Sequence, residues 1–286
     1  MPYTPSALKT SVLTGCTLLA FAANSLLTRM ALGPGAIDAA SFMTLRLAAG
    51  AVTLLVIMAG YHGKPVTKLQ GKWPAAVMLF LYAVTFSFSY LQLTAGTGAL
   101  ILFCTVQVTM ILVALQQGEK PQPLEWGGLL LALAGLLYLV SPGLAAPPLV
   151  GSILMVIAGI AWGFYSLLGR GAKDPVAYTT ANFVRAVPLA AVVSLVSLSG
   201  LHLTRSGVLL ALISGALASG VGYAIWYAAL DGLTATRAAT VQLTVPVIAS
   251  AGGILFLQEA LTVRLVLASL MILGGIGLAV MGRPLK

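Results

Sequence analysis

The residues of this chain that could do chemistry are polar and aromatic side chains placed at helical spacing within long apolar runs. Tyr82 and Tyr90 lie in one such run, and Tyr223 and Tyr227 lie in another. Positions four apart share one face of a helix, so Phe86 falls into line with the first pair. Aromatic rings with hydroxyl groups at their edges could hold a small amphipathic molecule. Alternatively, tyrosine and tryptophan belong to the aromatic belts at membrane surfaces.

A second pair of aromatic and polar faces lies earlier in each half of the chain. Trp162 and Tyr165 share one side of a predicted helix, and Phe21 and Asn24 share one side of another. These faces could complete the wall of the same cavity.

Arg46 and Arg185 are the charged residues that fall well inside apolar runs. A lone arginine in the centre of a membrane helix costs ~2.5–3.5 kcal/mol on insertion scales, so each needs a partner. Either guanidinium could bind a carboxylate through its planar fork. Either could instead bond a backbone carbonyl or extend towards the membrane surface. Pro188 favours the structural alternative for Arg185, because it leaves the Val184 carbonyl without its helical donor.

The pentapeptides TVQVT and TVQLT place a glutamine between two threonines in two separate apolar runs. In each, the threonines share one helix face, and Gln107 or Gln242 lies roughly 200° away from the first threonine. One face could line a cavity while the other contacts a neighbouring helix. We expect Gln242 to face the cavity, because Pro246 follows it by one turn and frees its carbonyl at a kink.

The elements that must position these residues are membrane-spanning helices. Hydrophobic residues make up 59% of the 286 residues and charged residues 7%, whereas soluble proteins have about 25% charged residues. Ten runs approach the ~20 residues that cross a bilayer as a helix. They cover residues 8–31, 38–61, 73–95, 98–116, 124–141, 149–169, 175–199, 206–230, 235–257 and 262–282. The sequence therefore predicts an all-α integral membrane protein with ten transmembrane helices.

The basic residues predict the orientation of these helices. The net charge is +9, from fifteen Lys and Arg against six Asp and Glu. If the amino terminus is cytoplasmic, ten basic residues fall on the cytoplasmic side and three on the other. This distribution follows the positive-inside rule. We therefore expect a multi-pass protein of the cell inner membrane with both termini in the cytoplasm, a membrane-lipid environment, and no nucleic-acid partner.

The chain also contains an internal repeat. AFAANSLLTR at 20–29 aligns with AWGFYSLLGR at 161–170, MTLR ending at Arg46 aligns with NFVR ending at Arg185, and the two TVQ segments align with each other. The prediction is two five-helix repeats, residues 1–146 and 147–286. Because each repeat has an odd number of spans, the two are inverted, as in many secondary transporters with a central site. A duplication that only made a stable bundle is the alternative.

Glycine-rich faces mark the fifth and tenth runs, in GGLLLALAG at 127–135 and LGGIG at 273–277. Small residues let membrane helices approach closely. We place these two helices at the periphery, where they could also form a homodimer contact.

The spans lack the residues that proton relays, enzyme catalysis, metal binding or a selective channel would need. All acidic residues and both histidines map to loops or helix ends, which favours exchange or uniport without a proton relay in the spans. No metal-binding, nucleophilic or phosphate-loop motif is present, so we predict a protein that is not an enzyme and needs no cofactor or metal. A channel is a weaker alternative, since no ring of charge or filter-like repeat is found.

The two halves, AWG early in the sixth run, the paired arginines and VPVIASAGGILFLQEALT at 245–262 resemble the EamA type of the drug/metabolite transporter superfamily over nearly the whole chain. Within it, the chain looks most like the YddG type of amino-acid exporter. The resemblance implies export of amino acids or related small amphipathic metabolites, with drugs or other metabolites as the alternative. The first half departs from the pattern, because Phe21, Ala22 and Ile111 replace Trp162, Gly163 and Pro246.

These observations give one set of candidate residues. The substrate-binding candidates are Asn24, Tyr82, Tyr90, Gln107, Trp162, Tyr165, Arg185, Tyr223, Tyr227 and Gln242. The hinge candidates are Pro188 and Pro246. We expect the cavity to be lined mainly by helices one to four and six to nine.

Overall fold

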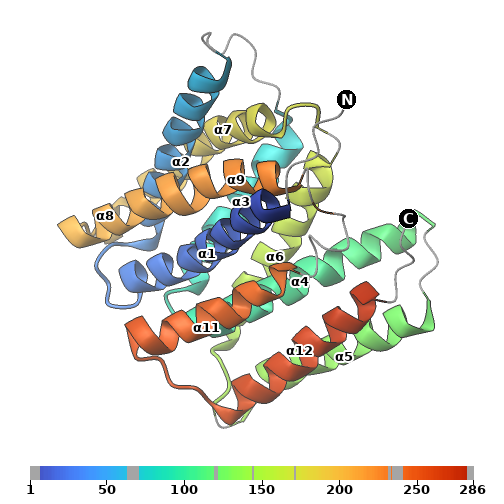
Figure 1. The fold of residues 1–286 in the computed structure, drawn as a ribbon. Helices are drawn as coiled ribbons and strands as arrows, with labels where there is room; N and C mark the ends of the chain where they lie inside the picture. Colours follow the sequence, from blue (N-terminus) through green and yellow to red (C-terminus); the bar gives the residue numbers. More distant parts are fainter. Residues whose placement is uncertain are drawn as a thin grey trace.

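The regular elements of the structure are helices. The computed structural model describes residues 7–62, 71–118, 122–143, 145–170, 172–230, 233 and 241–281 (Figure 1). Within these ranges the only β contact is an isolated bridge between Ile37 and Leu203. The predicted all-α class is therefore confirmed for the part of the chain that the structure describes.

The helices follow the predicted apolar runs in order. The first half contains α1 (Ala7–Leu32), α2 (Ala39–His62), α3 (Trp73–Ser89), α4 (Ala95–Gln116) and α5 (Pro123–Val140). The second half contains α6 (Leu149–Gly169), α7 (Pro175–Val196), the short η1 (Leu198–Gly200), α8 (Arg205–Ile213), η2 (Ser214–Val221), α9 (Gly222–Leu230), α11 (Thr244–Leu257) and α12 (Val263–Met281). Seven helical segments are long and apolar enough to cross a membrane, counting 205–230 as one, and three shorter apolar helices are α3, α11 and α12.

Local capping explains where several helices begin. The side chains of Thr94, Asp174 and Thr204 each accept a hydrogen bond from a backbone N–H in the first turn of the following helix. Such caps satisfy donors that have no partner within the helix. Proline in the first turn, as at Pro175, also favours initiation because its missing N–H is not needed there.

Three predicted spans differ in detail from the observed helices. The third was expected over 73–95, but α3 ends at Ser89 and a turn follows it. The eighth is continuous over 205–230 and contains the π-helix η2. The ninth was expected over 235–257, whereas α11 begins at Thr244, with Pro246 in its first turn. Residues 235–240 of that prediction lie outside the described residues.

Helix packing pairs elements from the two halves. The helix α3 packs on α6, and α1 packs on the segment formed by α8, η2 and α9. The helices α2 and α7 also pack on each other, as do α4 and α11. Further contacts join α4 to α6 and α1 to α11. These contacts place α1, α3, α4, α6 and the η2–α9 segment around a common interior.

The helices α5 and α12 form a separate pair at one edge of the bundle (Figure 1). A Cβ atom added at Gly128 would lie 2.3 Å from the carbonyl oxygen of Gly275. The same atom at Gly275 would lie 2.5 Å from the carbonyl oxygen of Gly128. Because no side chain fits between the backbones, these two glycines serve a contact within the chain.

Candidate functional site

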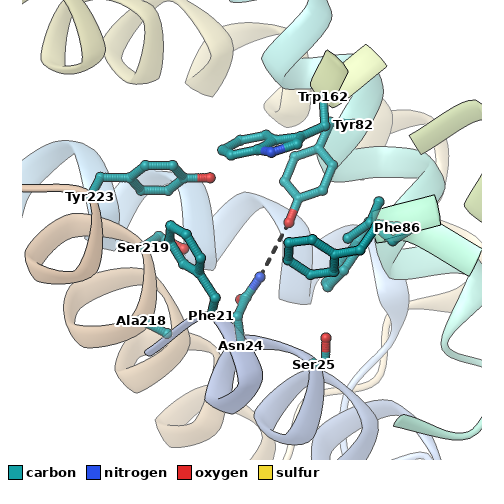
Figure 2. A pocket seen from close by; sticks show the side chains of 11 residues that line it. Phe21, Asn24, Ser25, Tyr82, Phe86, Trp162, Ala218, Ser219 and Tyr223 are labelled. Atoms are coloured by element: carbon teal, nitrogen blue, oxygen red, sulfur yellow. Dashed lines mark hydrogen bonds between the residues drawn. The ribbon is translucent and has the colours of Figure 1, made fainter. Parts of the chain in front are cut away.

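Four of the predicted site residues meet at one small cavity. Asn24 of α1, Tyr82 of α3, Trp162 of α6 and Tyr223 of α9 form part of its wall (Figure 2). The other lining residues are Phe21, Ser25, Phe86, Leu102, Phe103, Ala218 and Ser219. The cavity measures about 30 Å³, which leaves room for about two water molecules. We call it the aromatic pocket.

Asn24 is the polar centre of the aromatic pocket. Its Nδ2 donates a hydrogen bond to Oη of Tyr82 over 3.2 Å, the dashed line in Figure 2. Its Oδ1 accepts hydrogen bonds from Oγ of Ser214 at 2.8 Å and from Nη1 of Arg46 at 3.3 Å. Because two donors occupy Oδ1, the amide is fixed with its own donors towards Tyr82.

Arg46 of α2 lies behind Asn24 and does not contribute to the pocket wall. It is 2% exposed, and its Cζ atom lies 5.5 Å from the ring centroid of Tyr82 and 4.9 Å from that of Phe86. Desolvated contacts between a cation and a ring contribute ~2 kcal/mol, which offsets much of the cost of burying the charge. The sequence left a carboxylate or a backbone carbonyl as the partner of Arg46. The partners in the structure are instead a side-chain amide and two aromatic rings.

Aromatic rings from four helices surround the pocket. The ring of Trp162 lies 4.9 Å from that of Tyr82 and 5.2 Å from that of Tyr223, between centroids. Phe21 continues the series, 5.8 Å from Tyr223. Tilted pairs at such distances contribute about 0.5–1.5 kcal/mol each beyond their buried area. The rings therefore connect α1, α3, α6 and α9 into one wall.

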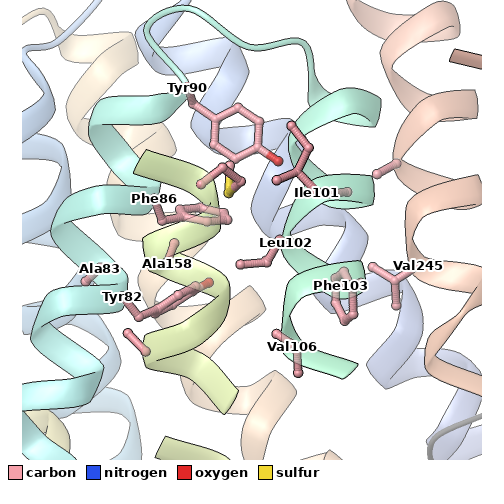
Figure 3. Close-up of a cluster of buried hydrophobic side chains, with 14 of the residues drawn as sticks. Tyr82, Ala83, Phe86, Tyr90, Ile101, Leu102, Phe103, Val106, Ala158 and Val245 are labelled. Carbon is pink, nitrogen blue, oxygen red and sulfur yellow. The ribbon is translucent and has the colours of Figure 1, made fainter. Parts of the chain in front are cut away.

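The aromatic stripe predicted for α3 is present, and only part of it lines the pocket. Figure 3 shows Tyr82, Phe86 and Tyr90 in a column along α3 that faces Ile101 and Leu102 of α4. Tyr90 is fully buried beyond the pocket and meets Phe86 edge-to-face, with ring centroids 4.8 Å apart. Its hydroxyl donates to the carbonyl oxygen of Ala95 over 3.3 Å. Its observed contacts are those of a packing residue at the α3–α4 turn.

The π-helix η2 supplies two serines at the pocket. Ser214 donates to Asn24, and Ser219 lies in the pocket wall. π-Helical turns are rare and occur frequently at functional sites. The predicted run 206–230 indicated a helix here but not its π geometry.

Two further predicted residues, Tyr165 and Tyr227, lie outside the pocket wall. Tyr165 is 3% exposed and stacks on Trp162 with centroids 5.3 Å apart. The hydroxyl of Tyr227 accepts a hydrogen bond from Oγ1 of Thr179 over 3.1 Å. Tyr227 therefore contacts α7 through Thr179, and Tyr165 packs on Trp162.

The threonine face of α4 makes a helix contact. Thr105 and Thr109 donate to backbone carbonyls within α4. Their methyl-bearing sides meet Gly159 and Gly163 of α6, where an added Cβ atom would lie 2.6 Å and 2.9 Å from threonine carbon atoms. This face therefore joins α4 to α6, which is one of the two roles left open by the sequence.

Neither predicted glutamine lines the aromatic pocket. Gln107 is 8% exposed on α4, and Gln242 is partly exposed just before α11. The proposed hinge residues lie in two settings, since α7 continues through Pro188 whereas Pro246 follows a helix break at Leu243. The roles of these four residues in transport stay predictions.

A polar clasp joins α1, α4 and the α11–α12 connection. Nε of Arg29 lies 3.5 Å from Oε1 of Glu259, whose two oxygens accept from the backbone N–H of Ala95 at 3.0 Å and 2.9 Å. Gln258 has a left-handed φ of 54°, which turns the chain after α11 towards this site. Burial raises the pKa of Glu259 above its ordinary value, an effect opposed by the Ala95 hydrogen bond and the Arg29 charge.

A larger groove between α3 and α6 is lined by apolar and aromatic side chains. Its volume is about 710 Å³, and it is lined by Trp73, Pro74, Val77, Met78, Leu81, Ile157, Ile160, Ala161, Phe164 and Leu168. A surface of this kind offers no set of polar groups to orient a polar ligand. The aromatic pocket is therefore the better candidate for a specific site.

Comparisons with known proteins agree with this architecture. Residues 149–281 match the EamA-like transporter family. An uncharacterized protein of Pseudomonas aeruginosa is 52% identical over 270 residues, which cover 94% of each chain. A probable amino-acid metabolite efflux pump of Salmonella typhimurium is 26% identical, and one of Escherichia coli 24%; each alignment covers 81% of this chain and 91% of the relative. A crystal structure with 18% identity covers 98% of this chain and 100% of its own, with a TM-score of 0.67, which supports the fold.

The chain therefore belongs to the EamA-like transporter family. This membership confirms the EamA-type resemblance seen in the sequence, and the closer likeness to a YddG-type exporter stays a prediction. It also makes the chain a multi-pass membrane protein of a transporter family and not an enzyme.

Sequence reasoning missed two residues that support the pocket. The sequence marks Arg46 as a charge inside a span without assigning it to the site, and it gives no assignment for Ser214. A signal for Arg46 was available, because an intramembrane charge is a functional candidate by default. For Ser214 the run of small residues in SGALASGVG was the available indication.

Proposed function

We propose that this chain is a secondary transporter that exports amino acids or related small amphipathic metabolites across the cytoplasmic membrane by alternating access. The aromatic pocket carries this proposal, because it brings Asn24 and the rings of Tyr82, Trp162 and Tyr223 together from both halves of the chain. Aromatic walls with a few fixed polar groups suit a small amphipathic ligand. The names of the relatives from Salmonella typhimurium and Escherichia coli support the same substrate class.

The inverted-repeat organisation is part of the proposal. We assign residues 1–146 to the first repeat and 147–286 to the second, which gives ten spans. The repeats pair α1 with α6, α2 with α7, α3 with the segment α8–α9, α4 with α11, and α5 with α12. Exchanging the partners converts the contact between α3 and α6 into the contact between α8–α9 and α1. It also converts the contact between α4 and α6 into the contact between α11 and α1. The α2–α7, α4–α11 and α5–α12 contacts map onto themselves. This exchange supports two repeats related by a two-fold axis, and the odd number of spans proposed for each repeat makes the pair inverted.

Transport requires the aromatic pocket to widen. The observed volume of about 30 Å³ is too small for an amino acid. Its wall comes from α1, η2 and α9 on one side and from α3, α4 and α6 on the other. We propose that these two groups separate to admit substrate, with Pro188 and Pro246 at the hinges and with Gln107 and Gln242 reached in a wider state.

The orientation follows from the charge distribution. We place both termini in the cytoplasm and the protein in the cell inner membrane, where the clasp of Arg29 and Glu259 lies at the outer end of the bundle. A homodimer through α5 and α12 would use other residues than Gly128 and Gly275, because those two already contact each other.

Counterflow in proteoliposomes tests this function. Vesicles that contain purified protein and a high internal concentration of one unlabelled amino acid should accumulate the same labelled amino acid, and the initial rate should saturate. The matched control is Tyr138→Phe, which changes a tyrosine beside Arg264 at the edge of the bundle, far from the pocket wall. Uptake that rises linearly with concentration would instead indicate a channel, and the absence of counterflow for all amino acids would reject this substrate class.

A further inference from the structure

A second group of polar side chains lies next to the aromatic pocket, on the other side of Trp162. It consists of Tyr165 on α6 and of Asn182 and Arg185 on α7, and we call it the inner cluster. Tyr165 stacks on Trp162, and its hydroxyl lies close to the side chains of Thr179 and Asn182. The lining of the aromatic pocket includes none of the three. The inner cluster is therefore a neighbour of that pocket and not part of it.

Each member of the inner cluster carries a buried polar atom without a hydrogen-bond partner among the described residues. These atoms are Oη of Tyr165, Nδ2 of Asn182 and Nη1 of Arg185. Asn182 is 0% exposed and Tyr165 is 3% exposed. Buried polar groups are nearly always paired, so three unpaired ones in one place need an explanation.

The three atoms share one chemical character. Nδ2 and Nη1 are donors only, and a tyrosine hydroxyl can donate as well. The described carboxylates of Asp38, Glu125, Asp174 and Glu259 belong to helix ends and connections elsewhere. The cluster therefore offers a positive charge and several donors without an acid of its own, which is the donor set that binds a carboxylate.

The start of α3 covers the inner cluster. The backbone N–H of Lys72 donates to Oδ1 of Asn182 over 3.2 Å, which leaves Nδ2 of the same amide for another partner. The ring centroid of Trp73 lies 5.7 Å from Cζ of Arg185. A Cβ atom at Gly71 would lie 2.6 Å from both Nη1 of Arg185 and Oδ1 of Asn182. Glycine at this position therefore lets the backbone close over the cluster without filling it.

We propose that the inner cluster is a second binding site, which holds the carboxylate of a small organic anion next to the aromatic pocket. Arg185 would bind the carboxylate with its planar fork, and Asn182 and Tyr165 would donate further hydrogen bonds. This site is proposed independently of transport. We further propose that the bound anion is the transported substrate, and only this second step rests on the proposed function. Since Trp162 contacts both Tyr165 and Tyr82, a ligand leaving this site for the aromatic pocket would move past one ring.

Ligand-observed fluorine NMR on the purified full-length protein tests the site without requiring transport. The probe is 3-fluorobenzoate, and its uncharged counterpart is 3-fluorobenzamide. Protein-free micelles give the baseline for each probe. The benzoate signal should broaden with wild-type protein and the benzamide signal should not. Arg185→Gln should weaken benzoate binding about tenfold or more, because a hydrogen-bonded charge pair is lost.

Further variants separate a binding role from a structural one. Tyr165→Phe and Asn182→Ala should each weaken benzoate binding, while Arg185→Lys, which keeps the charge but not the fork, should fall between wild type and Arg185→Gln. The matched control is Arg264→Gln, since Arg264 also lies 5.5 Å from an aromatic ring, that of Tyr138, outside the cluster. Elution volume and helical content check the fold of each variant.

The outcomes are distinguishable. Unchanged benzoate broadening in both Arg185→Gln and Asn182→Ala would overturn the proposal. So would loss of broadening in Tyr82→Phe and Asn24→Ala with full retention in Arg185→Gln, because the carboxylate would then bind in the aromatic pocket. Benzoate binding that depends on Arg185 in a protein without amino-acid counterflow would support the site and reject the proposed function alone.

Discussion

Two arginines inside the bundle, Arg46 and Arg185, have different surroundings. Nη1 of Arg46 donates to Asn24, and its guanidinium lies over two aromatic rings, while its Nε has no hydrogen-bond partner among the described residues. Arg185 contacts one ring, that of Trp73, and its buried Nη1 has no hydrogen-bond partner among the described residues. Their sequence contexts, MTLR and NFVR, align in the predicted repeat. Two residues that align in the predicted repeat therefore occupy different chemical environments in the structure.

This difference predicts a positioning role for Arg46 and a binding role for Arg185. Nη1 of Arg46 is held by Asn24 and its guanidinium lies over two rings, so we expect Arg46 to act through Asn24 and to be indifferent to the charge of a ligand. Nη1 of Arg185 has no such partner among the described residues, so we expect Arg185 to distinguish a carboxylate from an uncharged group. The predictions below test this contrast.

The largest effect is expected for Arg46→Gln. The change removes a charged donor from Oδ1 of Asn24 and two ring contacts from the back of the pocket. Loss of a hydrogen bond to a charged group costs about 1.5–3 kcal/mol, so counterflow should fall about 10-fold to 100-fold. The loss should be the same for substrates with a carboxylate and for their amides.

A double-mutant cycle with Asn24→Ala shows whether Arg46 acts through Asn24. The two changes should be strongly non-additive, because both disturb one hydrogen bond. Additive losses, or a loss confined to carboxylate substrates, would contradict the positioning role.

An intermediate effect is expected for Gly71→Ala. The new methyl group would meet Arg185 and Asn182 at 2.6 Å, so one of these side chains must move. Binding of 3-fluorobenzoate should weaken about fivefold, equivalent to ~1 kcal/mol. The matched control is Gly60→Ala in α2, where an added Cβ atom meets nothing within 4 Å. Equal effects of the two changes would contradict a carboxylate site beneath Gly71.

The smallest effect is expected for the ion pair of Arg29 and Glu259, in which a guanidinium already has a carboxylate partner. Glu259→Gln should change the free energy of unfolding by no more than ~1 kcal/mol, because the pair is partly exposed. Burial raises the pKa of Glu259, so the folded state binds the proton more readily than the unfolded state. The contribution of Glu259 to the free energy of unfolding therefore increases as the pH falls through the window between its ordinary and raised pKa values.

Thermal unfolding checks this sign. The melting temperature of wild type relative to Glu259→Gln should rise as the pH is lowered from 7 towards 5. A relative fall would mean that attraction to Arg29 outweighs burial at this carboxyl group.

The helices and four of the eleven residues that line the pocket could be predicted from the sequence. Apolar runs of membrane-spanning length indicated the helices, and polar or aromatic residues inside them indicated Asn24, Tyr82, Trp162 and Tyr223. These signals are local, because a hydroxyl or amide in an apolar environment needs a partner wherever it lies. The EamA resemblance added the transporter class through longer motifs.

The remaining contacts depend on which helix faces meet, and periodicity does not contain that information. Nothing in the spacing of Arg46 predicts that the ring of Phe86 would lie over its guanidinium. The threonine face of α4 and the glutamine face looked equally suited to a cavity until Gly159 of α6 was seen against Thr105. Likewise, the cover that Gly71 provides for Arg185 joins residues more than a hundred positions apart.

The π-helix Ser214–Val221 has a consequence for the permitted length of its span. A π turn accommodates a residue that an α-helix would not, so deleting one residue there would restore α geometry. Forcing the same residues into α geometry without a deletion would instead rotate every later side chain by ~100° about the helix axis. Tyr223 would then leave the aromatic pocket, although the apolar character of the segment would hardly change. The number of residues in this span is thus as much a determinant of the pocket as their identity.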